Sequence, residues 1–292
     1  MPTFNFKKIP DDRKAFDAKC RQKIIIYLES QEDFQIFKER WFYDEGEWLE
    51  FRSSDEGRGG GCAEVIRQVK SDRQNGIPAF GIVDRDAVMR ESKWDVFWEA
   101  DDQKYKNTMP FGHYVRPLCR WEIENYLLDP DELESILADE GKASPRSKRP
   151  AKLMIEELVG HCNTLIPVMA LNILFHENGT TSLDMVFGLT ECHNSNEMEQ
   201  KLSGKIPDSD KFKNYATRIE AFAENHPSDS REYLDRLNRM IDGKRIFHRI
   251  EHQNHLKDRR FSLARRIKEK NKIEVEITEL INGFKRDTPN LI

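Results

Sequence analysis

Two carboxylates, one residue apart, follow an apolar run in the segment "AFGIVDRD". The run from Ala79 to Val83 stops at Asp84, and Asp86 comes two residues later. A second run, "IIIYL", stops in the same way at Glu29, with Asp33 four residues further on. Carboxylates that lie close together raise one another's pKa unless a cation neutralises them, and Mg²⁺ or Mn²⁺ prefer such oxygen ligands. These spacings predict a divalent-metal site, and such metals commonly act on phosphate esters.

Each acidic pair also has a simpler explanation. An Asp-x-Asp after a strand can cap the following helix or pair with a nearby cation, here Arg85 or Arg90. A strand-ending Glu with an acid four residues on is equally weak by itself. The metal hypothesis gains weight only if one fold brings the two pairs together.

The elements that would position these acids alternate between strand and helix patterns. Short apolar, β-rich runs predict four strands, at residues 23–29, 47–54, 77–84 and 112–119. Helical patterns, "SQEDFQIFKERWF" and "CAEVIRQVKSDRQNG", separate the first three. Such alternation indicates βαβ units and an α/β fold with a parallel sheet flanked by helices. Ligands bind beyond the carboxyl ends of parallel strands, so both acidic pairs are expected at one edge if their strands are neighbours.

From about residue 141 the pattern becomes mainly helical. "GKASPRSKRPAK" is typical of a linker or loop, which divides the chain into an α/β core over 1–140 and a helical half over 141–292. Residues 244–272 carry eleven Lys or Arg against three Asp or Glu, a net +8, and leave −13 for the rest of a chain with net charge −5. A basic segment of this kind can mark a surface that binds nucleic acid. It can also be an ordinary solvated helix face, and composition alone makes the solvated face the better prediction.

Bulk properties restrict the class of protein. The 292 residues suffice for a sizeable core, and 34% charged residues suit a soluble protein. The N-terminus does not resemble a signal peptide, and no run approaches the roughly 18 apolar residues of a membrane helix. The five cysteines are odd in number and never spaced as C-x-x-C, which favours a reducing cytoplasm. "DEGRGGGCAEV" lacks the ending of a phosphate-binding P-loop, so ATP binding is not expected.

Two motifs carry a resemblance to a known family. Glu29-x3-Asp33 after the first strand, with Asp84-Arg85-Asp86 after a later one, resembles the Toprim fold, the metal-binding domain of topoisomerases, primases and overcoming-lysogenization-defect (OLD) nucleases. Toprim domains often have Gly after the motif Glu, where this chain has Ser30. The segment "RWEIENYLLDPDEL" resembles the signature of a bacterial Toprim-like nuclease group that includes the AriB effectors of PARIS anti-phage systems.

The resemblance implies roles for the first four acids. Asp84 and Asp86 would be the best metal ligands, because a strand end fixes them. Glu29 would ligate the metal or act as general base on the attacking water. Asp33 would be a second ligand or an outer group.

It also adds residues from further along the chain. Glu122 and Glu124 match the additional acids of the OLD nucleases, and Lys244 in "DGKRIFHRI" loosely matches their downstream lysine. The two glutamates would share a face in an extended segment, whereas on a helix at most one would reach the metal. Lys244 would neutralise developing charge on a phosphate; its alternative is a surface lysine near a helix start.

The resemblance implies a biological setting as well. The chain would be a Mg²⁺- or Mn²⁺-dependent endonuclease, a toxic effector in anti-phage defence. It would be held by an ABC-type ATPase sensor partner of the AriA kind and act, once released, as a homodimer on host tRNA. DNA cleavage is the other substrate possibility. The basic segment would supply the residues that bind nucleic acid: Arg245, Arg249, Lys257, Arg259, Arg260, Arg265 and Arg266.

Two other classes of protein remain open. "HRIEH" matches the H-x-x-E-H pattern of inverted zinc peptidases, with His248, Glu251 and His252 on one helix, but the required third ligand has no clear candidate. A non-catalytic scaffold is the other alternative, with Trp94 and Trp98 forming either a docking surface or part of a core. Divalent-metal binding discriminates the scaffold from the nuclease.

Overall fold

The computed structural model describes residues 23–55, 60–140, 147–189 and 192–288. Parts of the glycine-rich segment and of the expected linker, at 56–59 and 141–146, lie outside these ranges. The chain divides into two compact units that interleave along the sequence. The first takes residues 1–83, 111–117 and 271–292, and the second takes 84–110 and 118–270. This division differs from the single boundary expected near residue 140, and each unit is described by itself.

The first unit contains a four-stranded sheet in which every neighbouring pair is parallel. In the order β2-β1-β3-β4, its strands are β1 (Ile24–Leu28), β2 (Leu49–Ser53), β3 (Ala79–Val83) and β4 (Val115–Pro117). The two central strands, β1 and β3, are buried at every residue, which explains their continuous apolar sequences. The predicted α/β class with a parallel sheet is confirmed. The connections turn in opposite directions from β1 and β3, and ligands bind beyond the carboxyl ends of strands at such a switch point.

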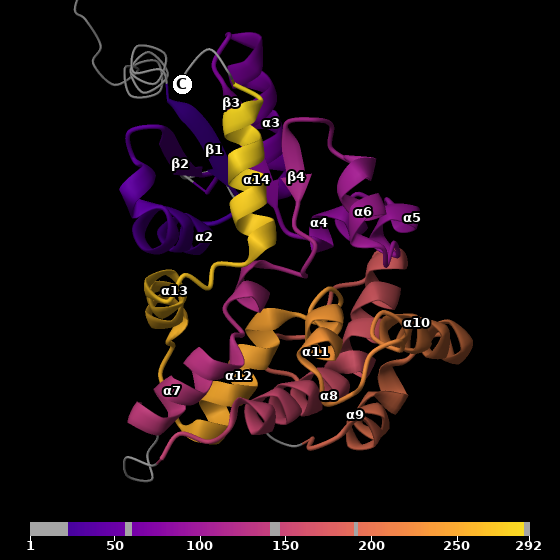
Figure 1. The fold of residues 1–292 in the computed structure, drawn as a ribbon. Helices are drawn as coiled ribbons and strands as arrows, with labels where there is room; N and C mark the ends of the chain where they lie inside the picture. The colour runs from indigo at the N-terminus through magenta and orange to yellow at the C-terminus, as the bar shows by residue number, and fades with distance from the viewer. Residues whose placement is uncertain (1–22, 56–59, 141–146, 190–191, 289–292) are drawn as a thin grey trace, which may run out of the picture. The chain divides into compact units, whose positions relative to one another are not determined.

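Helices cover this sheet (Figure 1). They are α2 (Gln31–Ile36), the π-helical η2 (Phe37–Trp41), the 3-10 turn η3 (Tyr43–Glu45), α3 (Cys62–Gln74) and α14 (Val275–Arg286). Helix α3 approaches β3 so closely that a Cβ on Gly81 would lie 2.5 Å from Cγ1 of Val65. Helix α14 packs through Phe284, whose ring stacks on Phe80 with 4.3 Å between centroids. The last helix of the chain therefore completes the core that the first strands begin.

The second unit is almost entirely helical. Its helices are α4 (Asp86–Arg90), α5 (Trp94–Phe97), α6 (Asp102–Thr108), α7 (Pro130–Glu140), α8 (Ala151–Glu177), α9 (Ser195–Leu202), α10 (Ser209–Ala221), α11 (Arg231–Leu237), α12 (Gly243–Asn254) and α13 (Arg260–Glu269). Two 3-10 turns, η4 (Ile123–Tyr126) and η5 (Ser203–Lys205), interrupt the connections. The long helix α8 is central and packs against α7, α9, α10, α11 and α12.

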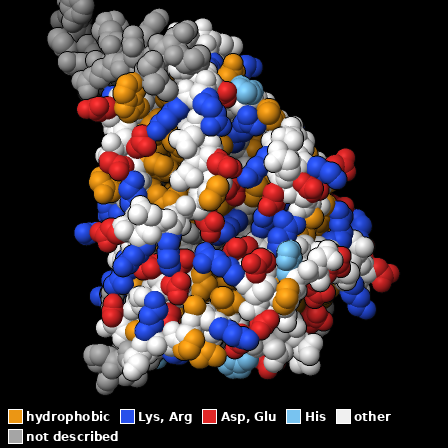
Figure 2. All heavy atoms as spheres, in the orientation of Figure 1, with side chains coloured by type: hydrophobic (Ala, Val, Ile, Leu, Met, Phe, Trp, Pro, Cys, Tyr) orange, Lys and Arg blue, Asp and Glu red, His pale blue; other side chains and the backbone are white. Residues whose placement is uncertain are grey.

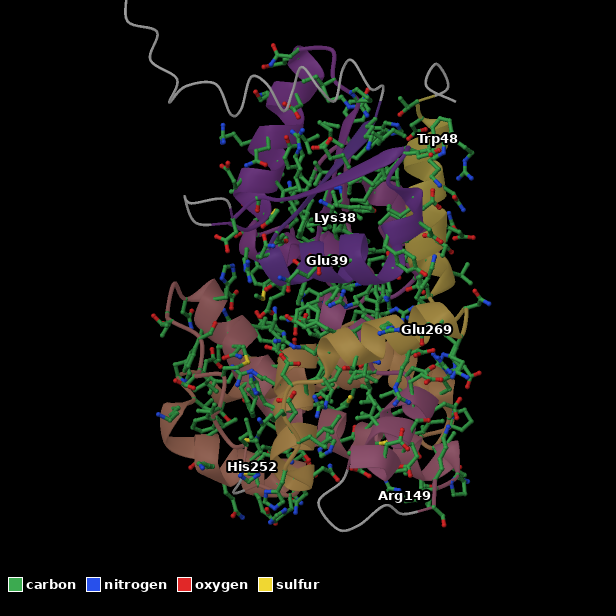
Figure 3. The ribbon with its side chains drawn as sticks, turned by 90° about the vertical axis from the view of Figure 1, so that its left-hand side faces the viewer. Lys38, Glu39, Trp48, Arg149, His252 and Glu269 are labelled. Carbon is green, nitrogen blue, oxygen red and sulfur yellow. The ribbon has the colours of Figure 1, made fainter. Side chains whose placement is uncertain are left out.

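Helix α8 bears on the expectation that no run of the sequence approaches the apolar length of a membrane helix. It is long and apolar enough to cross a membrane by length and composition alone. However, most of its apolar stretch is buried inside the protein, as is usual for a core helix. At its N-terminal end Arg149, labelled in Figure 3, pairs with Glu134 and Glu157 and so ties α7 to α8. The apolar surface of α8 therefore belongs to the core of the second unit.

Candidate acidic site in the second unit

The Asp84-Arg85-Asp86 motif is fixed by its central arginine. Arg85 is fully buried, and its guanidinium donates to the carbonyl oxygens of Cys119 at 3.0 Å, Phe97 at 2.8 Å and Glu99 at 2.9 Å. Its backbone N–H donates to the carbonyl of Trp121 at 3.0 Å. The arginine thus satisfies main-chain acceptors rather than an aspartate, and it places the start of α4 beside the segment that leads into Glu122.

Asn125 ties that segment to the connection between α11 and α12. Its Nδ2 donates to the carbonyl of Ile241 at 2.9 Å and to Oδ1 of Asn238 at 3.3 Å, and its Oδ1 accepts from the Glu122 N–H at 3.1 Å. A Cβ on Gly243 would lie 2.8 Å from Asn125 Oδ1, so only glycine allows this approach. Two segments more than 110 residues apart in sequence are therefore locked together.

The lock brings three predicted residues into contact. The Glu122 carboxylate accepts from the Lys244 N–H at 2.7 Å and from Lys244 Nζ at 3.0 Å. Lys244 Nζ also lies 3.6 Å from Oε1 of Glu124. Glu122 has an extended backbone (φ −155°, ψ 177°) immediately before η4, so it does not diverge from Glu124 as it would inside a regular helix. Both glutamates therefore reach the same ammonium group.

Asp86 and Asp242 add two more carboxylates. Arg90 binds Oδ2 of Asp86, whereas Oδ1 of Asp86 is buried and has no hydrogen-bond partner among the described residues. Burial raises the pKa of Asp86; Arg90 opposes this effect and the Glu122 charge adds to it. Burial, the Glu122 charge and a hydrogen bond between the two carboxyl groups raise the pKa of Asp242 well above its usual range. Asp242 therefore lies next to Glu122, and the charge of Glu122 acts on Asp86 as well.

Asp242 was missed in the sequence. It is the N-cap of α12, where Oδ1 accepts from the Arg245 N–H at 2.9 Å. An Asp immediately before "GKRIFHRI" is a recognisable cap signal, which could have located the helix start. That signal would not have shown that Glu122 lies beside it, because the contact joins distant parts of the chain.

Arg260 closes the cluster from the start of α13. Its Nη1 lies 2.8 Å from Oε1 of Glu124, whose side chain is fully buried. Its Nη2 lies 2.7 Å from Oδ2 of Asp258, a residue whose side chain is 44% exposed. The guanidinium therefore has one buried and one exposed carboxylate partner.

The carboxylates of the cluster meet some of the needs of a divalent cation. Mg²⁺ is commonly held by one or two carboxylates, with water and phosphate oxygens completing its shell. Asp86 supplies a buried oxygen that has no hydrogen bond, and Glu122 lies near enough for its charge to affect Asp86. Among the described residues, no group of three or more His, Cys, Asp or Glu side chains is arranged to hold a metal. The set fits only a partial cation site among the described residues: Oδ1 of Asp86 has no hydrogen bond, whereas both oxygens of Glu122 already accept from Lys244, and the carboxylates do not form a closed protein cage.

Glu29 and Asp33 belong to the first unit. Glu29 directly follows β1 and is buried, and its carbonyl accepts from Ser54 Oγ at 2.9 Å and from the Gly61 N–H at 3.2 Å. Asp33 forms a capping box at the start of α2: its Oδ2 accepts from the Ser30 N–H, and its own N–H donates to Ser30 Oγ, both at 3.1 Å. Ser30, the departure from the Toprim pattern, is thus a helix cap. The convergence of all four motif acids stays a prediction.

Two of the predicted nucleic-acid contacts need correction. Arg245 and Arg249, on α12, are buried at 3% and 2% exposure. Arg245 donates to the carbonyls of Leu183, Asp184 and Met185, and Arg249 donates to those of Gly188 and Cys192. They are structural, because each buried guanidinium binds main-chain carbonyls between α8 and α9.

The other predicted contacts differ in their exposure. Arg260 is bound to Glu124 as above, Arg266 pairs with Asp139, and Arg265 pairs with Glu269 at 2.7 Å, while Lys257 is exposed and Arg259 half-buried. On the face drawn in Figure 2, Lys and Arg side chains alternate with Asp and Glu, without a broad field of one sign. Exposed cations for a phosphate backbone therefore come from the middle and the C-terminal part of the predicted segment, at Lys257 and Arg265.

The remaining sequence candidates lie elsewhere in the second unit. His248 Nδ1 is 3.8 Å from Glu251, and His252 projects from α12 (Figure 3). Phe97 is buried, and Trp98 stacks on Tyr215 with 5.6 Å between centroids and has Arg218 over its ring. These aromatic contacts favour a core role over a docking role.

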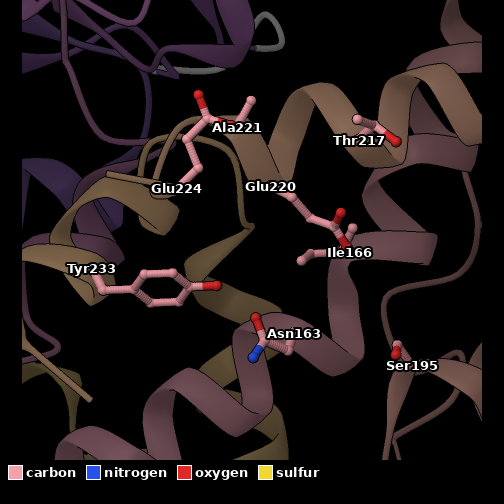
Figure 4. A pocket seen from close by; sticks show the side chains of 8 residues that line it. All are labelled: Asn163, Ile166, Ser195, Thr217, Glu220, Ala221, Glu224 and Tyr233. Atoms are coloured by element: carbon pink, nitrogen blue, oxygen red, sulfur yellow. The ribbon is translucent and has the colours of Figure 1, made fainter. Parts of the chain in front are cut away.

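A cavity of about 470 Å³ lies among α8, α9, α10 and α11 (Figure 4). Its lining includes Tyr233, Asn163 and Glu220, and none of the clustered acids. Burial, together with the Glu220 charge, raises the pKa of Tyr233. The cavity is open, its lining is part polar and part apolar, and it contributes nothing to the acidic site.

Comparison with known proteins found no match: no family model, no curated protein and no solved structure matches this chain. The assignment of function therefore depends on the geometry of the second unit and on the sequence resemblance.

Proposed function

We propose that this protein is a divalent-metal-dependent nuclease of the Toprim-like, OLD-nuclease-related kind. The observation that carries the proposal is the meeting of Glu122, Glu124 and Lys244. The sequence resemblance alone points to these residues, and Lys244 is more than a hundred positions from the glutamates. The strand order of the first unit is compatible with the proposal, since Glu29 and Asp84 each directly follow one of the two strands at the switch point.

In this proposal Asp86 and Glu122 hold Mg²⁺ or Mn²⁺, and Asp84 and Glu124 keep their predicted roles as further ligands. The bound cation would lower the pKa of a water and polarise a phosphodiester. Lys244, whose side chain is one-third exposed, is placed to balance charge on the phosphate. Asn125 and Gly243 hold the two segments in register. Glu29 retains its predicted role as ligand or general base, and Asp33 that of an outer group.

The biological setting extends the proposal by resemblance. The substrate would be nucleic acid, with tRNA preferred over DNA. The active form would be a homodimer released from an ABC-type ATPase sensor during phage infection. Lys257 and Arg265 are exposed cations suited to a phosphate backbone.

One observation favours a second candidate, a metal-free scaffold. Protein cations already bind oxygens of Asp86, Glu122 and Glu124. A cluster of this kind can be a structural ion-pair network with no ligand at all. Metal binding separates the two candidates, because the scaffold does not need it.

The test is cleavage of labelled tRNA, single-stranded RNA and plasmid DNA in Mg²⁺, Mn²⁺ or EDTA. The variants are Asp86→Asn and Lys244→Met, with the exposed Asp95→Asn as the matched control, each with and without an ATPase sensor and its trigger. Metal-dependent cutting that both site variants lose and the control keeps supports the nuclease. Absence of cutting, together with absence of Mn²⁺ binding by calorimetry, supports the scaffold.

A further inference from the structure

Glu124 occupies an unusual electrostatic position. Its side chain is fully buried, yet it is accompanied by two protein cations, Arg260 at 2.8 Å and Lys244 at 3.6 Å. A buried carboxylate that loses a partner becomes an uncompensated charge, at a cost of several kcal/mol. Loss of one of these cations therefore raises the free-energy cost of the buried Glu124 charge, and binding of another cation becomes more favourable.

The two cations are not held equally. Lys244 lies in the first turn of α12, and both its backbone N–H and its Nζ bind Glu122. Arg260 instead begins a separate helix, α13, after the non-helical residues 255–259. Lys244 is thus fixed by its own helix, whereas Arg260 depends on the placement of α13.

Arg260 also has a second partner ready. Asp258 accepts from the Arg260 backbone N–H at 2.9 Å and lies 2.7 Å from its Nη2. Asp258 precedes Arg260 by two residues, so the two move together. The Asp258–Arg260 ion pair therefore persists when Arg260 leaves Glu124. Helix α13 is the last element of the second unit before the chain enters the first at Asn271. A displacement of this helix would therefore act on the Arg260–Glu124 pair.

We propose that the Arg260–Glu124 ion pair is an inhibitory latch that withholds Glu124 from a divalent cation, with Asp258 as the partner that retains Arg260 when the latch opens. The latch adds regulation to the proposed metal site and depends on the proposed function only in treating Glu124 as a potential ligand. In one state Arg260 pairs with both Glu124 and Asp258, and metal binding is weak. In the other state Arg260 pairs with Asp258 alone, and Glu124 is available to a metal. Any event that moves α13 shifts the populations of these two states.

The test is Mn²⁺ binding to the full chain without nucleic acid, by electron paramagnetic resonance and calorimetry. Arg260→Gln opens the latch and is expected to tighten Mn²⁺ binding about tenfold, within the usual range of coupling between sites. The gain should vanish in Arg260→Gln/Glu124→Gln. The matched control is Arg265→Gln on the same helix, which loses only an exposed pair with Glu269, the residue labelled in Figure 3. It should bind Mn²⁺ like the wild type.

A second variant moves the balance the other way. Asp258→Asn removes the alternative partner and leaves the Arg260–Glu124 pair intact, so Mn²⁺ should bind more weakly than to the wild type. This exposed substitution keeps the test informative if Arg260→Gln fails to fold. Unchanged or opposite Mn²⁺ affinities in folded Arg260→Gln or in Asp258→Asn would overturn the latch.

The outcomes separate the latch from the nuclease. If the affinities shift as expected while no form of the protein cuts nucleic acid, the latch stands and the proposed function fails. If the wild type cuts nucleic acid with Mn²⁺ but neither variant shifts affinity, the nuclease stands and the latch fails.

Discussion

At the scale of single residues, the candidate site depends on close approach as much as on charge. Gly243 lets the start of α12 reach Asn125, and that approach places the Lys244 N–H on Glu122. The acids supply the reactive groups, whereas Asn125 and Gly243 fix the distance between the two segments that carry Glu122 and Lys244. This distinction leads to a prediction about a residue with no functional group.

Gly243→Ala should destabilise the protein by about 1–3 kcal/mol, because the added methyl would overlap Asn125. Chemical denaturation measures the loss, and Gly204→Ala, where a Cβ meets nothing within 4 Å, is the control. Mn²⁺ binding should weaken in the folded fraction of Gly243→Ala. A fully stable Gly243→Ala variant would show that the two segments tolerate separation.

His161 gives a pH prediction at the same scale. Burial, with a smaller effect of the Arg249 charge, lowers the pKa of His161 to about 4, and Arg249 Nε donates to its Nδ1. In the unfolded chain the His161 imidazole therefore binds a proton near pH 6.5, whereas in the folded chain it stays neutral down to about pH 4. Stability should fall as the pH drops from about 6.5 to 4, by up to about 3 kcal/mol at roughly 1.4 kcal/mol per pH unit.

Denaturant titrations at several pH values measure this dependence. His161→Gln keeps a hydrogen-bond acceptor for Arg249 and should flatten the wild-type slope over that interval. An unchanged slope in His161→Gln would assign the acid sensitivity to other groups.

At the scale of elements, sequence patterns located the strands well because a short Ile- and Val-rich run has few alternatives. "IIIYL" and "AFGIV" became the two central strands, buried on both faces. The same reasoning failed for α12. Its arginines looked like a basic surface, but Arg245 and Arg249 face inward and bind loop carbonyls. Composition counts charges and does not reveal which face of a helix is covered.

The acidic site was predictable only in part for a related reason. Glu122 and Lys244 were selected by resemblance, since periodicity cannot pair residues that are more than a hundred positions apart. Asp242 and the role of Arg260 emerged only from the contacts of α12 and α13. Motif residues at strand ends could be read locally, and their partners from other helices could not.

Phe284→Ala tests how one helix supports the sheet. Removing a buried ring that stacks on Phe80 should cost about 3–5 kcal/mol. Val275→Ala on the same helix is the control, because Val275 is 65% exposed and should change little. Stability is measured by thermal and denaturant unfolding. Equal stability of the two variants would contradict a stabilising role of α14 in the core.

At the scale of the whole molecule, the two compact units should differ in how they open. In Phe284→Ala, amide hydrogen exchange should accelerate in β1 and β3, while amides of α8 keep their protection. Mass spectrometry of peptides from each unit measures the difference. Equal acceleration in both units would show that they unfold as one cooperative structure.

The interleaved chain also sets an order of assembly. Every segment of the helical unit precedes residue 271, whereas the sheet unit lacks Phe284 until α14 has been synthesised. Because chains fold progressively from the N-terminus during translation, the helical unit can mature while β3 still has an uncovered Phe80. A stalled chain of residues 1–270, extended by a C-terminal linker long enough to clear the ribosome exit tunnel, would therefore carry a finished acidic cluster and an unfinished sheet. Protease resistance of such nascent chains should appear first in the helical unit.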